Sequence, residues 1–146
     1  METKLILLVE DNADDELLML RALKKNHILN RIVVARDGVE ALAYLFSTGA
    51  YAGNDSEPLP QLVLLDLKLP KINGHEVLKR MRADRRTKYI PVVVLTSSNE
   101  EQDVISSYDM GANAFVQKPI DFNEFVEAAN QLGVFWLGVN RSVYPK

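Results

Sequence analysis

Five short apolar runs recur along this chain, and each is separated from the next by a segment with the apolar spacing of a helix. Most of the runs are rich in Leu, Val and Ile, which is typical of parallel strands covered on both faces. We expect these strands at residues 4–9, 31–35, 62–65, 91–95 and 114–117. Strict alternation of strands and helices favours an α/β fold, a doubly wound five-stranded parallel sheet with five helices.

Three of the helix starts share the spacing of a capping box, in which a side chain accepts a hydrogen bond from the backbone three residues later. The pairs are Asp37 with Glu40, Ser98 with Glu101, and Asp121 with Glu124. The helix after Ser98 carries Val104, Ile105 and Tyr108 at helical spacing and is expected to end at Gly111. The other two helices are expected over residues 14–25 and 75–82.

Two of the apolar runs lead directly into acidic residues. The third run ends at Asp66, and the first ends at Glu10 and Asp11. If these strands are parallel neighbours, the three carboxylates meet at one edge of the sheet, where like charges repel. A hard divalent cation with oxygen ligands, Mg²⁺ above all, would compensate that charge.

Asp66 also has the chemistry of a nucleophile, because a carboxylate can attack phosphorus and form an aspartyl phosphate. Such a transfer depends mainly on neutralising charge on the phosphoryl oxygens. Lys118 follows the fifth run and offers a cation, and Thr96 follows the fourth and offers a hydroxyl donor. Either residue alone would read as turn or surface chemistry. Because the acidic residues, Thr96 and Lys118 all follow strand ends of one alternating pattern, a phosphoryl site is favoured.

Composition limits the class of protein. The chain has 146 residues, a net charge of −3 and no cysteine, so thiol catalysis and Cys-ligated zinc are excluded. Lys and Arg are scattered among Asp and Glu, which argues against a nucleic-acid partner. The first apolar run is too short for a signal sequence or a membrane span. We therefore expect a single cytoplasmic domain over residues 1–146, with no membrane partner.

The joint order and spacing of these motifs closely resemble the receiver domain of two-component response regulators. The matching segments are Val9–Asn12, Leu64–Pro70 with Asn73–Gly74, Leu95–Ser97, Gly111–Ala112 and Lys118–Pro119. The likeness covers about residues 4–132. It implies a flavodoxin-like fold of the receiver type and a signalling protein rather than an enzyme.

The resemblance also implies a role for each matching residue. Asp66 would be the phosphoacceptor, and Glu10 and Asp11 would be the acidic pair that binds Mg²⁺ with it. The main-chain carbonyl of Lys68 would be a further metal ligand.

Three more residues match positions that respond to the phosphoryl group in this family. Thr96 and Lys118 would contact that group directly. Phe115 lies where the family has its aromatic switch, but it lacks the hydroxyl that many members carry there. An ordinary core aromatic remains an equal interpretation of Phe115.

The family receives its phosphoryl group from a sensor histidine kinase. No effector domain is expected after the fifth helix, only a short extension at about 139–146. Output would then pass through altered protein contacts, and a homodimer through the fourth helix, fifth strand and fifth helix is plausible. The long 48–60 loop and the tail with Trp136 resemble single-domain regulators paired with cyanobacterial phytochrome kinases.

Two other classes stay open. A phosphatase of the haloacid dehalogenase type also uses a strand-end aspartate, but it normally has a second aspartate two residues later, where this chain has Lys68. A flavodoxin-like binding module would need a phosphate-binding loop after the first strand. Glu10 and Asp11 would repel an anion there.

Overall fold

The computed structural model describes residues 5–25, 31–49, 53, 59–97, 100–118 and 121–132. Within them five strands form one sheet: β1 (Leu5–Val9), β2 (Arg31–Ala35), β3 (Leu62–Leu65), β4 (Val92–Thr96) and β5 (Ala114–Gln117). The helices are α1 (Ala13–Lys25), α2 (Gly38–Phe46), α3 (Gly74–Ala83), α4 (Glu101–Asp109) and α5 (Phe122–Leu132). The sheet order is β2-β1-β3-β4-β5 with every pairing parallel, which confirms the expected doubly wound α/β fold.

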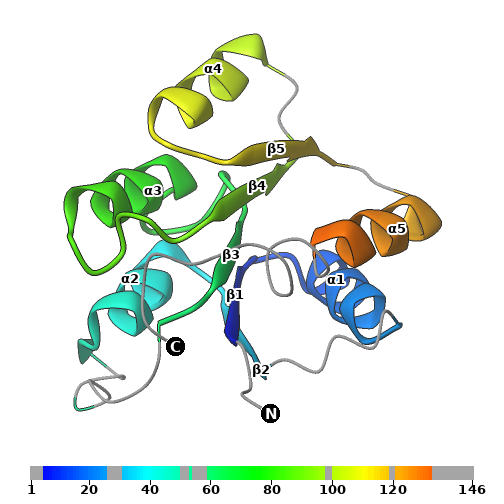
Figure 1. Ribbon diagram of the computed structural model, residues 1–146, viewed down its shortest axis with the longest axis horizontal. Coiled ribbons are helices and arrows are strands. Elements are labelled where there is room, and N and C mark those ends of the chain that lie inside the picture. The colour runs from blue at the N-terminus through cyan, green and yellow to red at the C-terminus, as the bar shows by residue number, and fades with distance from the viewer. Residues whose placement is uncertain are drawn as a thin grey trace.

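Helices cover both faces of the sheet (Figure 1): α1 and α5 lie side by side on one face, and α2 and α3 lie on the other. Side chains alternate between the two faces along each strand. In β1, Leu7 and Val9 join the core under α2 and α3, whereas Ile6 and Leu8 join the core under α1. Every residue of β1 is therefore buried, which explains its continuous apolar sequence.

The register of the central strands determines where the polar residues meet. Val9 of β1 is the partner of Leu65 of β3, so the residues after each strand emerge next to one another. On the other side of β3, Leu65 is the partner of Val94 of β4. The ends of β1, β3 and β4 thus form one edge of the sheet.

Two of the three predicted helix caps lie in described residues, and both are confirmed. Asp37 Oδ1 accepts a hydrogen bond from the Glu40 backbone N–H at 2.7 Å, and Asp121 Oδ2 accepts one from Glu124 at 3.2 Å. Ser98, the third predicted cap, lies outside the described residues. The structure begins α4 at Glu101, after a residue whose side chain makes no cap hydrogen bond.

Two of the apolar residues that recur at helical spacing in α4 do not face the core. Ile105 and Tyr108 are 46% and 49% exposed, and the fully buried side chain of this helix is that of Ser107. The Ser107 hydroxyl donates to the Asp103 carbonyl at 2.7 Å, so a small polar residue can occupy the buried position. The apolar residues of α4 therefore include Ile105 and Tyr108, which form part of an exposed surface.

The fourth strand is shifted by one residue from its expected range. It begins at Val92 because Pro91 has no N–H for the ladder, and it continues to Thr96, which pairs with Gln117 of β5. Lys4, most of the 48–60 loop, Trp136 and the 139–146 extension lie outside the described residues. In the described part of the chain, every helix is too short or too polar to cross a bilayer.

Candidate functional site

The acidic residues are positioned by backbone hydrogen bonds that continue the sheet beyond its last paired residues. The Glu10 N–H donates to the Ala35 carbonyl at 2.9 Å, and the Asp66 N–H donates to the Val9 carbonyl at 3.0 Å. The backbones of both acidic residues are thereby fixed, and their side chains extend from a rigid edge. A site built on strand ends needs little reorganisation when a ligand binds.

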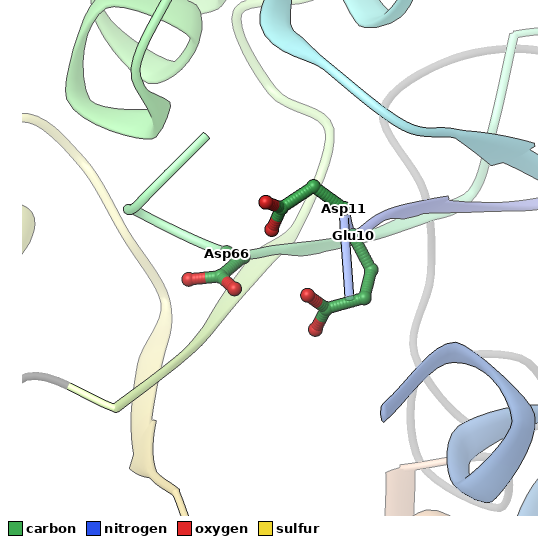
Figure 2. A group of neighbouring side chains, drawn as sticks. All are labelled: Glu10, Asp11 and Asp66. Atoms are coloured by element: carbon green, nitrogen blue, oxygen red, sulfur yellow. The ribbon is translucent and has the colours of Figure 1, made fainter. Parts of the chain in front are cut away.

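Figure 2 shows the carboxylates of Glu10, Asp11 and Asp66 turned toward one another. One oxygen from each lies within 4.8 Å of the others. Glu10 and Asp66 are buried, 1% and 7% exposed, whereas Asp11 is open to solvent. Three hard oxygen donors around one point, with access from one side, suit a divalent cation that keeps some of its waters.

A lysine balances part of this negative charge. The Lys118 ammonium, itself buried, contacts Glu10 Oε1 and lies 3.1 Å from Asp66 Oδ2 and 2.9 Å from Asp15 Oδ2. Burial lowers the pKa of Lys118, but hydrogen bonds to Glu10 and Asp15 and the charge of Asp66 outweigh that effect and raise it. Lys118 therefore carries a positive charge at neutral pH.

Glu10 has the least accessible carboxylate of the group. Burial raises the pKa of Glu10 to about 7, and the Asp66 charge adds to that rise, although Lys118 and the Asn12 N–H oppose it. The Asn12 N–H donates to Glu10 Oε2 at 3.2 Å. Burial thus brings proton binding by Glu10 near neutral pH, and a nearby divalent cation would favour the charged form.

Asp15 is a member of the charged cluster that the sequence analysis missed. It lies in the first turn of α1, 103 residues away from Lys118 in the chain. Its own N–H donates to the Asn12 side chain at 2.9 Å, which fixes the start of the helix. The available signal was the position of Asp15 in the first turn after Glu10 and Asp11, since a helix that starts at a strand end keeps its first turn near that edge.

The loop after Asp66 is held tightly. The Lys68 N–H donates to Asp66 Oδ1 at 3.1 Å, and the Gly74 N–H donates to the Leu67 carbonyl at 2.8 Å. A Cβ on Gly74 would lie 2.3 Å from the Asp66 carbonyl oxygen, and a Cβ on Gly38 would lie 1.9 Å from the carbonyl oxygen of Ile72. The two glycines therefore allow close backbone contacts at two points of this loop, Asp66 and Ile72.

The remaining predicted residues lie next to this cluster. Thr96 is fully buried as the last residue of β4, and its carbonyl accepts a hydrogen bond from the Lys118 N–H at 2.6 Å. Phe115 is half-buried in the middle of β5 and packs against the core under α2 and α3. Lys68 is exposed. The structure thus brings Glu10, Asp11, Asp66 and Lys118 together and places Thr96 beside them.

Known proteins resemble the chain over nearly its whole length. The probable methanogenesis regulatory protein FilR2 of Methanothrix harundinacea (strain 6Ac) is 40% identical over 141 residues, 97% of this chain and 88% of FilR2. The response regulator Rcp1 of Synechocystis sp. (strain ATCC 27184 / PCC 6803 / Kazusa) is 40% identical over 134 residues, 92% of this chain and 89% of Rcp1. The likeness therefore extends beyond the motifs to the whole domain.

Solved structures agree with this likeness. The phosphorylated cyanobacterial phytochrome response regulator RcpA superimposes with a TM-score of 0.88 at 38% identity, covering 98% of this chain and all of RcpA. The Mn²⁺-bound form of Rcp1 gives 0.85 at 38% identity, covering 97% and 99% of the two chains. The bacteriophytochrome response regulator AtBRR gives 0.77 at 53% identity, covering 97% and 100%.

The family model for the response regulator receiver domain matches residues 6–130, which include every charged residue of the cluster and all of the strands except Leu5, the first residue of β1. The sheet order, the acidic group at the ends of β1 and β3, and the lysine after β5 occur together within that match. The chain belongs to the response regulator receiver domain family.

Proposed function

We propose that this protein accepts a phosphoryl group on Asp66 from a sensor histidine kinase, in a Mg²⁺-dependent reaction, and signals through altered protein contacts. One observation carries the proposal: the buried Asp66 carboxylate lies within 4.8 Å of Glu10 and Asp11 and bonds to the Lys118 ammonium. A nucleophilic carboxylate thereby lies beside one cation, Lys118, and beside two acidic residues that could hold a second, divalent cation. Positive charge of both kinds would neutralise an incoming phosphoryl group.

The transfer balances without any further reactant. A carboxylate oxygen of Asp66 attacks the phosphorus of a phosphohistidine, an O–P bond forms, and the P–N bond breaks. The histidine imidazole leaves with the bonding electron pair and takes up a proton from solvent. The side chain of Asp66 changes from a carboxylate with one negative charge to an acyl phosphate with more, which its cationic neighbours must then balance.

The oxygen donors present fit Mg²⁺, because three carboxylates converge and one side stays open for water. Glu10, Asp11 and Asp66 would hold the ion, together with the main-chain carbonyl of Lys68. When bound, the cation would supply charge neutralisation on the transferred oxygens. The Mn²⁺-bound form of Rcp1 supports a divalent site in this family.

Lys118 and Thr96 would respond to the new charge. The ammonium of Lys118 would donate to a phosphoryl oxygen, and the hydroxyl of Thr96 at the end of β4 would donate to another. Phe115, half-buried in β5, would repack as Thr96 moves, although it also serves as a core aromatic. The result is a shift between two populations of the same fold.

For the output we propose that this receiver domain, over residues 1–146, forms homodimers through α4, β5 and α5. The exposed apolar side chains of Ile105 and Tyr108 on α4 support this surface. Ile105→Glu should weaken self-association of the phosphorylated protein on a sizing column. Leu17→Glu, an equally exposed apolar position on α1, is the matched control.

We further propose a phytochrome-type kinase as the partner, because RcpA is a cyanobacterial phytochrome response regulator and AtBRR is a bacteriophytochrome response regulator. Phosphotransfer from purified, radiolabelled kinases would test it, with photoreceptor and non-photoreceptor kinases compared at equal concentration. We expect the fastest transfer from a photoreceptor kinase. Equal or faster transfer from a kinase without a light-sensing domain would contradict this partner.

The acceptor itself is tested with acetyl phosphate, which needs no kinase. We expect intact-mass spectrometry to show the gain of one phosphoryl group in the wild type with Mg²⁺, and none after EDTA treatment. Asp66→Asn should show no gain. Asp109→Asn, which changes an exposed aspartate at the end of α4, should be labelled like the wild type. Undiminished labelling of Asp66→Asn would refute the proposal.

A further inference from the structure

Lys118 has a carboxylate partner outside the three residues that would hold the metal. Asp15 Oδ2 lies 2.9 Å from the Lys118 ammonium, nearer than Asp66 Oδ2 at 3.1 Å. Asp15 comes from α1, whereas Glu10 and Asp66 come from strand ends. An ammonium has three N–H donors, and these three carboxylates can occupy all of them.

We propose that Asp15 competes with the phosphoryl group for the Lys118 ammonium, and so weakens the bias toward the phosphorylated conformation. This inference rests on the proposed function, in which Lys118 donates to a phosphoryl oxygen. A new oxygen partner must displace one of the existing three. Because bonds to charged groups are the strong ones, the competition takes place between groups of similar strength.

Exposure indicates which of the three contacts gives way. The side chains of Glu10 and Asp66 are 0% and 8% exposed, whereas that of Asp15 is 38% exposed. A carboxylate that water can reach is rehydrated when it loses its partner, so releasing Asp15 leaves no buried charge behind. Releasing Glu10 would leave one.

The same contacts argue against Asp15 as a support that Lys118 requires. Glu10 already bonds to the ammonium in the buried interior, and the Lys118 backbone is held by the Thr96 carbonyl at 2.6 Å. Lys118 is therefore positioned from two directions without Asp15. Asp15 adds an electrostatic attraction that draws the Lys118 ammonium toward α1.

The size of the effect follows from the partial exposure of Asp15. Ion pairs of this kind are typically worth about 0.2–1 kcal/mol, which corresponds to roughly a 1.4- to fivefold change in an equilibrium constant. Removing the competing carboxylate should strengthen binding of a phosphoryl analogue by about that factor.

The probe is beryllofluoride with MgCl₂, which binds a carboxylate as a phosphoryl analogue, measured by isothermal titration calorimetry. We expect Asp15→Asn and Asp15→Ala to bind beryllofluoride about 1.4- to fivefold more tightly than the wild type. Asp15→Glu, which keeps the carboxylate, should return to nearly wild-type affinity. Asp14→Asn is the matched control, because it changes the net charge equally at an exposed position one residue earlier in α1.

The inference would be overturned if Asp15→Asn and Asp15→Ala both bound beryllofluoride no more tightly than the wild type. An equal gain in affinity in Asp14→Asn would overturn it as well. Circular dichroism melting of each variant verifies that α1 is retained. The wild type separates this inference from the proposed function. If the wild type neither binds beryllofluoride nor accepts a phosphoryl group, the proposed function fails; if it does both and the Asp15 variants match it, only the competition fails.

Discussion

Lys118 and Arg82 are both cations held within the fold, but they are held by different kinds of group. Lys118 contacts three carboxylates, on Glu10, Asp15 and Asp66. The Arg82 guanidinium bonds mainly to backbone carbonyl oxygens. A carboxylate can bind a proton, a metal or a phosphoryl group, whereas a backbone carbonyl keeps one chemical form. The first cation can therefore change partners, and the second fixes a shape.

The Arg82 contacts join three segments of chain. Nε and Nη2 donate to the Gly111 carbonyl at 3.0 and 2.7 Å, and Nη1 donates to the carbonyls of Ile90 and Lys88 at 2.7 and 2.9 Å. Arg82 thus ties the end of α3 to the loop before β4 and to the loop before β5. A planar guanidinium with several donors suits this task, and an ammonium does not.

The largest expected effect is at Lys118. Lys118→Met should lower the free energy of unfolding by about 3 kcal/mol in EDTA, because it leaves Glu10 and Asp66 buried without their cation. Added Mg²⁺ should recover part of that loss by binding the native state. Urea denaturation in EDTA and in MgCl₂ measures both effects, with the exposed Lys71→Met as the control. A variant as stable as the wild type in EDTA would contradict this account of the cluster.

Arg82→Ala should lower the free energy of unfolding somewhat less, by about 2 kcal/mol. Water can reach some of the carbonyl groups that lose their hydrogen bonds to Arg82. The loss should be the same with and without Mg²⁺. Arg82→Lys should recover only a minor part, since one ammonium cannot reach both loops. Arg80→Ala, on the exposed side of the same helix, provides the baseline in the same denaturation series. Rescue of Arg82→Ala by Mg²⁺ would break the distinction between the two cations.

The smallest effect belongs to the ion pair between the exposed Lys71 and the partly buried Asp37, 3.4 Å apart. The Glu40 N–H, with help from Lys71, lowers the pKa of Asp37. The charged form therefore stabilises the fold above the unfolded pKa of about 3.9, and this stability is lost as pH falls through the lower folded value. Asp37→Asn keeps a capping oxygen and should lose about 0.5 kcal/mol at pH 7.

The pH dependence of that difference is the sharper readout. Denaturation midpoints of the wild type and Asp37→Asn should converge below about pH 4. Lys71→Met should lose less stability than Asp37→Asn at pH 7. The Glu40 N–H, rather than Lys71, is the main cause of the lowered pKa of Asp37. If the stability difference between the wild type and Asp37→Asn widened on acidification, the pKa of Asp37 would not be lowered by folding, and this prediction would be wrong.

Sequence predicted most of the fold because its signals are local. Apolar runs gave the strands within a residue, and the caps at Asp37 and Asp121 depend on a spacing of three residues. The convergence of Glu10, Asp11 and Asp66 also followed, since parallel neighbours end at the same edge. Their roles in phosphoryl transfer stay predictions until the labelling experiment is done.

Contacts between distant elements could not be predicted in the same way. The pairing of Asp15 with Lys118 depends on how α1 is rotated against the end of β5, and no local pattern encodes that angle. Arg82 looks like any helical surface arginine until two loops fold around it. The exposure of Ile105 and Tyr108 could not be predicted, because helical spacing identifies an apolar face without showing what covers it.

The glycines beside the Asp66 loop have a consequence for how this domain can vary. A methyl group on Gly74 would meet the Asp66 carbonyl and move the backbone that carries the nucleophile, and a methyl group on Gly38 would displace Ile72 in the same loop. Such a change would alter the orientation of the Asp66 side chain before it disrupted the fold. A chain altered there could keep its shape, purify normally, and yet be unable to receive its signal.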